Sequence, residues 1–259
     1  MKNMCLRLVD IAKPIVAIII FFSILALLQY FDISIFMNFG KLPGGEEIFA
    51  DLVKTISDLH FYINIMSSLI RVYIGFIYAS IVAIPLAFLV TQSCICKNYL
   101  YPIMELLRPI PNAAWIPLAI LLIHSIEGSV IFIIFLSAFF PIFVNTVKGI
   151  ENVHSNYIKT AKSLGCTRCA YILEILLPAA LPSIFAGLFL GMSGAWLGVV
   201  MAEMINGQSG IGYMIWSSYT LVNTSEVIIG MFTIGSMGAL SSLALKIFSN
   251  RITCWMPNE

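Results

Sequence analysis

Six long apolar stretches, none containing Asp, Glu, Lys, Arg or His, constrain this chain more than any other feature. A helix needs about 20 apolar residues to cross a hydrocarbon core of about 30 Å, and a charge in mid-span costs about 2.5–3.5 kcal/mol. The sequence therefore predicts an all-α polytopic membrane protein with about six transmembrane helices. The expected spans are residues 14–31, 72–90, 110–123, 130–147, 184–202 and 227–245.

The first and third stretches differ from an ordinary membrane span. The first follows Lys2, Arg7 and Lys13, as a signal peptide would, but no small-x-small cleavage site follows it, so we expect an uncleaved span. The third has 14 residues and starts at Pro109 and Pro111, where proline disfavours a straight helix. We expect a kinked start there, and five spans plus a re-entrant piece is the alternative.

Lysine and arginine predict the orientation, because short cytoplasmic loops retain positive charge. With the N-terminus inside, the outer segments hold two such residues, Lys41 and Lys54, and Arg71 stands at the edge of the second span. Both termini are therefore expected in the cytoplasm. The inner segments hold the other eleven: Lys2, Arg7, Lys13, Lys97, Arg108, Lys148, Lys159, Lys162, Arg168, Lys246 and Arg251.

All six cysteines fall on the predicted inner side, where thiols stay reduced. The pairs Cys94-x-Cys96 and Cys166-x-x-Cys169 have no His or further Cys at ligand spacing, so we expect ordinary thiols and no metal.

Other function classes lack their signatures. A net charge of +1 is too small for nucleic-acid binding, and no Gly-x-x-x-x-Gly-Lys-Ser/Thr phosphate loop occurs. The uncharged spans offer no proton relay to an ion-coupled secondary carrier, which would also show two related halves.

The segments between spans differ in character. Residues 32–64 are expected outside and contain a turn at Pro43-Gly44 followed by an amphipathic helix. Residues 203–226 are rich in Gly, Ser and Asn, so a flexible loop is favoured, with a gate or a surface for an external delivery protein as the alternative. The expected organisation is 1–31 (cytoplasmic N-terminus and first span), 32–64 (external segment), 65–250 (transmembrane core with a cytoplasmic loop at 149–183) and 251–259 (cytoplasmic tail).

Small residues pattern the fifth span in two ridges, which predicts close packing against a neighbouring helix or a second copy. The ridges are Gly187, Gly191 and Ala195, and Gly194, Gly198 and Ala202.

The inner segment from Ser155 to Pro178 predicts two short helices joined at Gly165. Ser155 and Thr167 are suitable N-caps, and Gly165 suits the left-handed residue that ends the first helix. Pro178 and Pro182 are expected to close the second. Such a projection suits docking to a soluble protein, and an interfacial helix on lipid is the alternative. The apolar face of the first helix consists of Tyr157, Ile158, Ala161 and Leu164.

This segment resembles the "EAA" loop of ABC importer permeases in the spacing of Ala161, Gly165, Ile175, Leu177 and Pro178. The motif's Glu and first Ala are Lys159 and Thr160 here, so the family's acidic contact cannot be carried over. Further stretches resemble the nitrate, sulfonate and taurine branch: Ser68-Leu69-x-Arg71-Val72, Pro109-Ile110-Pro111, Phe139-Phe140-Pro141, Leu177-Pro178-Ala179-Ala180-Leu181-Pro182 and Ala195-Trp196-x-Gly198-Val199-Val200-x-Ala202-Glu203.

The resemblance implies a type I ABC importer permease fold and a homodimer in the bacterial inner membrane. Two cytoplasmic ATPase subunits would hold ATP and Mg²⁺, this chain would hold no cofactor, and an external solute-binding protein would deliver a small anion such as sulfonate, taurine or nitrate. A pyrimidine or thiamine precursor is the alternative solute. The residues expected to couple to the ATPase are Tyr157, Ile158, Lys159, Ala161, Leu164, Gly165 and Pro178.

The charges nearest the spans are Arg71, Arg108 and Glu203. Snorkelling or helix-end anchoring is the favoured explanation for them, and an anion path is the alternative for the two arginines. Together with Pro109, Pro111 and Trp196, these residues are the candidates for a translocation path or gate.

Overall fold

The computed structural model describes residues 43–154, 156–157, 161, 163 and 165–253. The predicted first span, residues 14–31, lies outside the described residues. The chain divides into two compact units, Met1–Val53 and Lys54–Glu259.

Helix α2 (Gly45–Ser57) confirms the amphipathic helix predicted after Pro43-Gly44. Its first turn carries Glu46 and Glu47 and its last turn carries Lys54. These charges complement the helix dipole, which is positive at the N-terminus and negative at the C-terminus.

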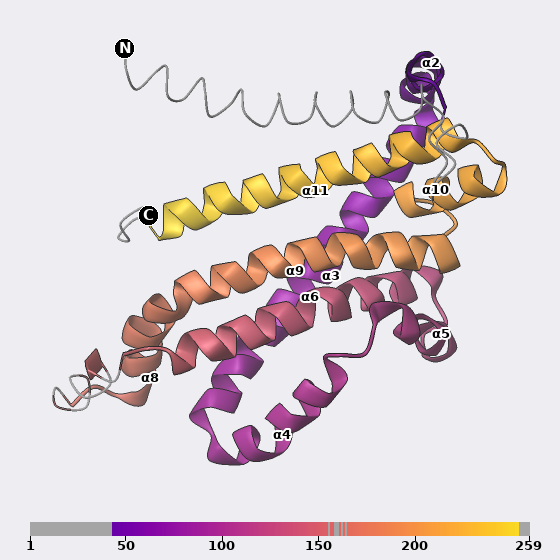
Figure 1. Cartoon of the computed structure of the whole chain (residues 1–259). Coiled ribbons are helices and arrows are strands. Elements are labelled where there is room, and N and C mark those ends of the chain that lie inside the picture. Colours follow the sequence, from indigo (N-terminus) through magenta and orange to yellow (C-terminus); the bar gives the residue numbers. More distant parts are fainter. Residues whose placement is uncertain (1–42, 155, 158–160, 162, 164, 254–259) are drawn as a thin grey trace, which may run out of the picture. The chain divides into compact units, whose positions relative to one another are not determined.

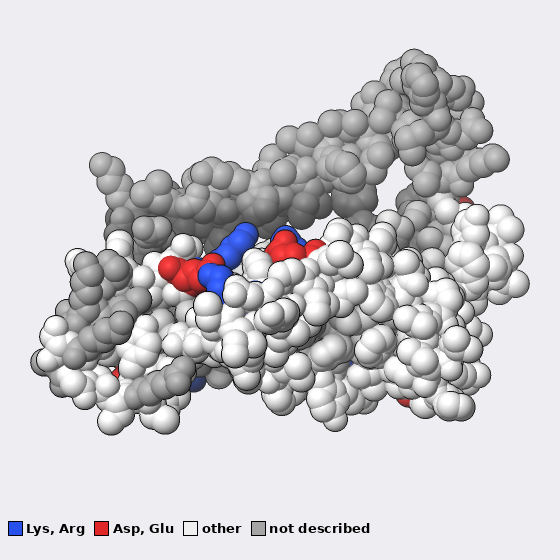
Figure 2. Space-filling model, turned by 90° about the horizontal axis from the view of Figure 1, so that it is seen from below, with Lys and Arg blue, Asp and Glu red and all other residues white. Residues whose placement is uncertain are grey.

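Four helices of the second unit are long and apolar enough to cross a membrane, and they contain four of the predicted spans. They are α3 (Leu59–Gln92), α6 (Ile126–Glu151), the helix that ends in α9 (Leu177–Asn206), and α11 (Thr224–Ile252). Figure 1 shows α6 beside α9, with α11 on the other side of α9. Figure 2 shows that the charged side chains on this face are confined to small patches.

The predicted third span is not a single crossing helix. Helix α5 (Asn112–Leu122) has 11 residues, or roughly 16 Å, about half the hydrocarbon thickness. It is preceded by α4 (Cys94–Leu107), and the break between the two falls at Pro109 and Pro111, as predicted for a kinked start. The described residues therefore contain four long helices and one broken pair, and the count of six is not confirmed.

Helix α6 is the centre of the core, because it packs against both α3 and α9. The small residues predicted in the fifth span serve this contact. A Cβ added at Gly187 would lie 2.9 Å from the Cβ of Asn145, and one at Gly194 would lie 2.5 Å from the carbonyl oxygen of Ser137. The neighbour of these glycines is therefore α6 of the same chain.

Gly194→Ala should lower the free energy of unfolding, because the new methyl group would press on the backbone of α6 rather than on a movable side chain. Overpacking of this kind costs about 1–3 kcal/mol. Gly235→Ala on α11 is the matched control, because no atom of the described residues lies within 4 Å of its added Cβ. Thermal unfolding of the two detergent-purified variants measures their melting temperatures. If Gly194→Ala and Gly235→Ala melted at the same temperature, the tight α6–α9 contact would be contradicted.

The segment before α9 differs from the prediction. Thr167 does cap a helix, since its Oγ1 accepts from Ala170 N at 3.3 Å. However, α8 (Arg168–Ala170) and the π-helix η2 (Tyr171–Leu176) lead directly into α9, so Pro178 and Pro182 do not close the second helix. Leu177 N donates to Ile172 O, five residues back. This widened turn accommodates Pro178, whose ring would clash with a carbonyl in a regular helix.

The favoured prediction of a flexible loop for residues 203–226 is wrong. Helix α9 continues to Asn206, and α10 (Ile211–Thr220) packs against both α9 and α11. Ile211, Met214 and Ile215 of α10 are buried. The glycines that suggested flexibility instead permit close packing, as described below.

Candidate functional site

A buried ion pair joins two helices that are distant in sequence. Arg71 Nη1 of α3 lies 2.7 Å from Glu203 Oε1 of α9, and the side chains are 5% and 0% exposed. Hydropathy had placed both residues at span ends, where their charges could reach water. The structure shows instead that neither snorkels, because each is enclosed and paired with the other.

The Glu203 carboxylate has further donors. Ser68 Oγ, one turn before Arg71 on α3, lies 2.9 and 2.8 Å from its two oxygens. Gly212 N donates to Oε2 at 3.0 Å, so the first turn of α10 also contacts this carboxylate. Hydrogen bonds to several donors offset part of the cost of removing a carboxylate from water.

The guanidinium of Arg71 also makes hydrogen bonds through each of its three nitrogens. Its Nε donates to Glu127 Oε2 at 2.7 Å, and its Nη2 donates to the other oxygen of Glu127, near the start of α6. Nη1 also donates to Ser209 O at 2.6 Å. Glu127 is 59% exposed, so this arm of the cluster reaches the surface. We call Ser68, Arg71, Glu127, Glu203 and Ser209 the arginine cluster, which ties α3, α6 and α9 to the segment before α10.

Glycines around Glu203 make this arrangement possible. Gly210 has φ +115°, and a Cβ there would collide with the Glu203 carboxylate. A Cβ at Gly212 would lie 2.7 Å from Val200 O of α9. The pattern Gly207-x-x-Gly210-x-Gly212 therefore folds the backbone tightly over a buried carboxylate.

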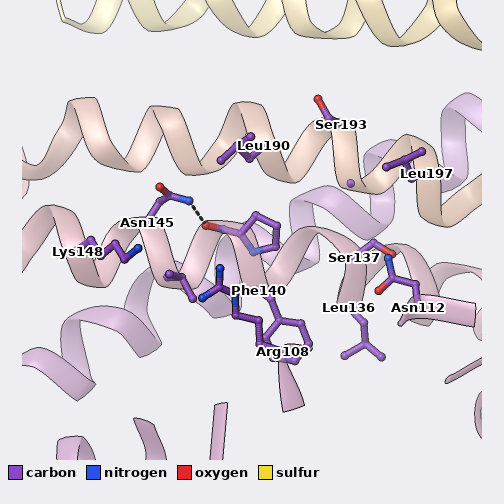
Figure 3. Close-up of a pocket in the computed structure, with 13 residues that line it drawn as sticks. Arg108, Asn112, Leu136, Ser137, Phe140, Asn145, Lys148, Leu190, Ser193 and Leu197 are labelled. Carbon is purple, nitrogen blue, oxygen red and sulfur yellow. Dashed lines mark hydrogen bonds between the residues drawn. The ribbon is translucent and has the colours of Figure 1, made fainter. Parts of the chain in front are cut away.

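A second polar feature is a cavity of about 620 Å³ between α6, α9 and the α4–α5 junction (Figure 3). Apolar side chains such as Leu136, Phe140 and Leu190 form much of its wall. Its polar lining residues are Arg108, Asn112, Ser137, Asn145, Lys148 and Ser193.

Two cations dominate the electrostatics of this cavity. Figure 3 shows the side-chain nitrogens of Arg108 and Lys148 directed toward the same space. Arg108 is 49% exposed, and Glu105 lies 3.7 Å from one of its nitrogens, which makes a loose ion pair. Among the described residues that line the cavity, none is acidic.

The other candidate path residues lie elsewhere. Pro109 and Pro111 form the break between α4 and α5. Trp196 is buried and donates from Nε1 to Ser241 Oγ of α11 at 3.3 Å. It lines an apolar groove of about 830 Å³ between α9 and α11, rather than the cation-lined cavity. The structure thus separates the predicted path residues into an ion pair, a cavity, a helix break and a helix contact.

The predicted coupling segment is described in part. Gly165 has φ +66°, and Cys166 N donates to Ala161 O at 3.1 Å, which is the helix-ending geometry predicted for Gly165. Ala161 is buried, whereas Tyr157 is exposed, so Ala161 packs inside the chain rather than on the segment's surface. Pro178 lies within α9. Ser155, Ile158, Lys159 and Leu164 lie outside the described residues.

Known proteins resemble this chain over most of its length. It is 35% identical to the nitrate import permease protein NrtB of Leptolyngbya laminosa over 78% of this chain and 72% of that protein. It is 32% identical to the bicarbonate transport system permease protein CmpB of a Synechocystis species over 89% of this chain and 85% of that one. A crystal form of the inward-facing methionine ABC transporter MetNI shares the fold, with a TM-score of 0.56, 16% identity, and coverage of 72% of this chain and 96% of the MetNI chain.

The family comparison agrees with these relatives. Residues 75–254 match the family described as "Binding-protein-dependent transport system inner membrane component". The matched region covers α6, α9, α10, α11 and most of α3, and so includes the cation-lined cavity. The chain therefore belongs to this family, as an ABC importer permease of the nitrate-type branch.

Proposed function

We propose that this permease subunit forms the membrane path for a small inorganic anion such as nitrate or bicarbonate. The observation that carries the proposal is the resemblance to permeases named for nitrate and bicarbonate import, which extends over 78% and 89% of the chain. The cation-lined cavity supports it, because Arg108 and Lys148 favour anions over cations and neutral solutes. Sulfonates and taurine also carry a negatively charged group that these cations would attract. A thiamine precursor has no observation in its favour.

The energy source in this proposal is ATP hydrolysis on two separate cytoplasmic subunits, which hold ATP and Mg²⁺. The contact with them is the segment around Gly165, whose exposed residues include Tyr157 and Gly165. A second copy of the permease and an external solute-binding protein complete the assembly. Both termini then face the cytoplasm, in keeping with the distribution of lysine and arginine.

Proteoliposomes test this function directly. The permease, reconstituted with the ATPase and the solute-binding protein encoded beside it, should import labelled nitrate or bicarbonate only when ATP is supplied to the ATPase side. Excess unlabelled anion should abolish uptake, and neutral amino acids should not. The control is a variant ATPase that binds ATP without hydrolysing it. Uptake that follows an ion gradient without ATP, or that carries only a neutral solute, would contradict the proposal.

A further inference from the structure

The cation-lined cavity contains two cations, Arg108 and Lys148, whose side chains have donors free for a ligand among the residues that the structure describes. Arg71 contacts two carboxylates and the Ser209 carbonyl, so its donors are occupied within the chain. Within the described part of the chain, the one ion-pair contact of Arg108 is that with Glu105, at 3.7 Å. Lys148 has no ion-pair partner among the residues that the structure describes.

We infer that this cavity is a binding site, on the permease itself, for a small oxyanion held by Arg108 and Lys148. A guanidinium presents five N–H donors in a planar fork and an ammonium presents three, and both suit the oxygens of nitrate, bicarbonate or a sulfonate. The inference rests on the proposed function and adds to it a recognition site within the membrane subunit.

Three of the four neutral polar side chains that line the cavity donate hydrogen bonds within their own helices. Asn145 Nδ2 donates to Pro141 O at 2.8 Å, and Ser137 Oγ donates to Ile133 O at 2.7 Å. Ser193 Oγ donates to Phe189 O at 3.2 Å, also within its own helix. The two serine hydroxyl protons and one of the two amide N–H donors of Asn145 are already used, so they add little attraction for an anion. Selection by charge, rather than by a precise set of hydrogen bonds, is therefore expected.

The size of the cavity sets the expected affinity. A volume of about 620 Å³ is many times the roughly 30 Å³ share of one water molecule, so a small anion would keep part of its hydration. Water and the half-exposed position of Arg108 screen the charges. We expect a dissociation constant on the order of 1 mM, which is weak enough for the anion to leave.

The two cations of the cavity lie at one end of it. Arg108 ends α4, and Lys148 lies in the last turn of α6, whereas Ser137 and Leu197 lie deeper along α6 and α9. In the proposed orientation, the cations stand at the cytoplasmic mouth. A phosphate of an inner-leaflet lipid offers the same chemistry as a free oxyanion, so the test must separate these two sources.

The test is nitrate binding to the permease–ATPase complex in nanodiscs of zwitterionic lipid, measured by equilibrium dialysis with labelled nitrate. Saturable binding is expected, and the double variant Arg108→Gln/Lys148→Gln should weaken it at least tenfold. The charge-matched control is Lys246→Gln/Arg251→Gln, which removes two exposed cations of α11 outside the cavity lining. The charge-retaining variant Arg108→Lys/Lys148→Arg should restore most of the binding.

Three outcomes would overturn the inference. These are equal binding to the wild type and the double variant, equal loss in the α11 control, and nitrate binding that disappears when anionic phospholipid replaces the zwitterionic lipid. The last result would assign the cavity to a lipid headgroup.

Binding and uptake are measured separately, so the two proposals can fail separately. Loss of nitrate binding in the double variant would support the site even if the reconstituted transporter imported a neutral solute. ATP-driven anion uptake that is unaffected by the double variant, with no binding measured, would leave the proposed function standing and remove the site.

Discussion

The Arg71→Gln variant should unfold at a much lower temperature than the wild type and accumulate poorly in the membrane. The change leaves the Glu203 carboxylate, which is 0% exposed, without its cation. Removing one partner of a buried ion pair typically costs about 3–5 kcal/mol, since the remaining charge stays buried. Thermal unfolding in detergent and the amount of inserted protein measure the effect.

The double variant Arg71→Gln/Glu203→Gln should recover most of this loss, because two neutral amides replace the two charges. Glu127→Gln should cost no more than about 1 kcal/mol, since that carboxylate is 59% exposed. Arg251→Gln, at an exposed position of α11, controls for the removal of a positive charge alone. A double variant as unstable as Arg71→Gln would show that the arginine cluster does not act as a coupled pair.

Gly165→Asp should abolish ATP-driven uptake, with at least a tenfold loss, while the permease remains inserted at a normal level. No atom of the described residues lies within 4 Å of a Cβ added at Gly165, so these residues leave room for a side chain. The φ of +66° costs a non-glycine residue about 1–2 kcal/mol, and Asp tolerates this conformation better than most residues. Lost transport in a folded permease would therefore locate a partner at this surface.

Gly165→Asn is the matched control, because Asn has nearly the same shape and the same tolerance of a positive φ, but no charge. It should retain more uptake than Gly165→Asp if the added charge is what repels the partner. Co-purification of the ATPase subunit provides a second measurement. Normal ATPase recovery together with normal uptake in Gly165→Asp would rule out this segment as the docking contact.

Hydropathy predicted the four long helices, but it placed the start of α3 and the end of α9 too far inside, and so left out Arg71 and Glu203. The apolar windows stopped at residues 72 and 202, because the next residues are Arg71 and Glu203. In the structure α3 begins at Leu59 and α9 ends at Asn206, so both charges lie inside helices. An apolarity scan treats every charge as a boundary. It cannot recognise two charges that become compatible with burial only when the fold brings them together.

The remaining errors have local causes. The prolines Pro178 and Pro182 predict a helix end, but the wider π-turn before Pro178 relieves the clash there, and α9 continues through Pro182. The glycines of residues 207–212 suggest a flexible loop from the sequence alone, whereas in the structure they let the backbone approach Glu203 closely. Ser68 could have been found from its position three residues before Arg71 on a helix face. Glu127 and Lys148 give no sequence signal, because only the fold shows what they face.

The continuous helix that carries Glu203 has a mechanical consequence. From Tyr171 to Asn206 it runs for 36 residues without a loop, a strut of roughly 54 Å. One end adjoins the segment around Gly165, and the other end is anchored by the arginine cluster. A displacement applied at one end would reach the other as rigid motion. Proteins that bind at the two ends, on opposite sides of the bilayer, would then both depend on the position of this one helix.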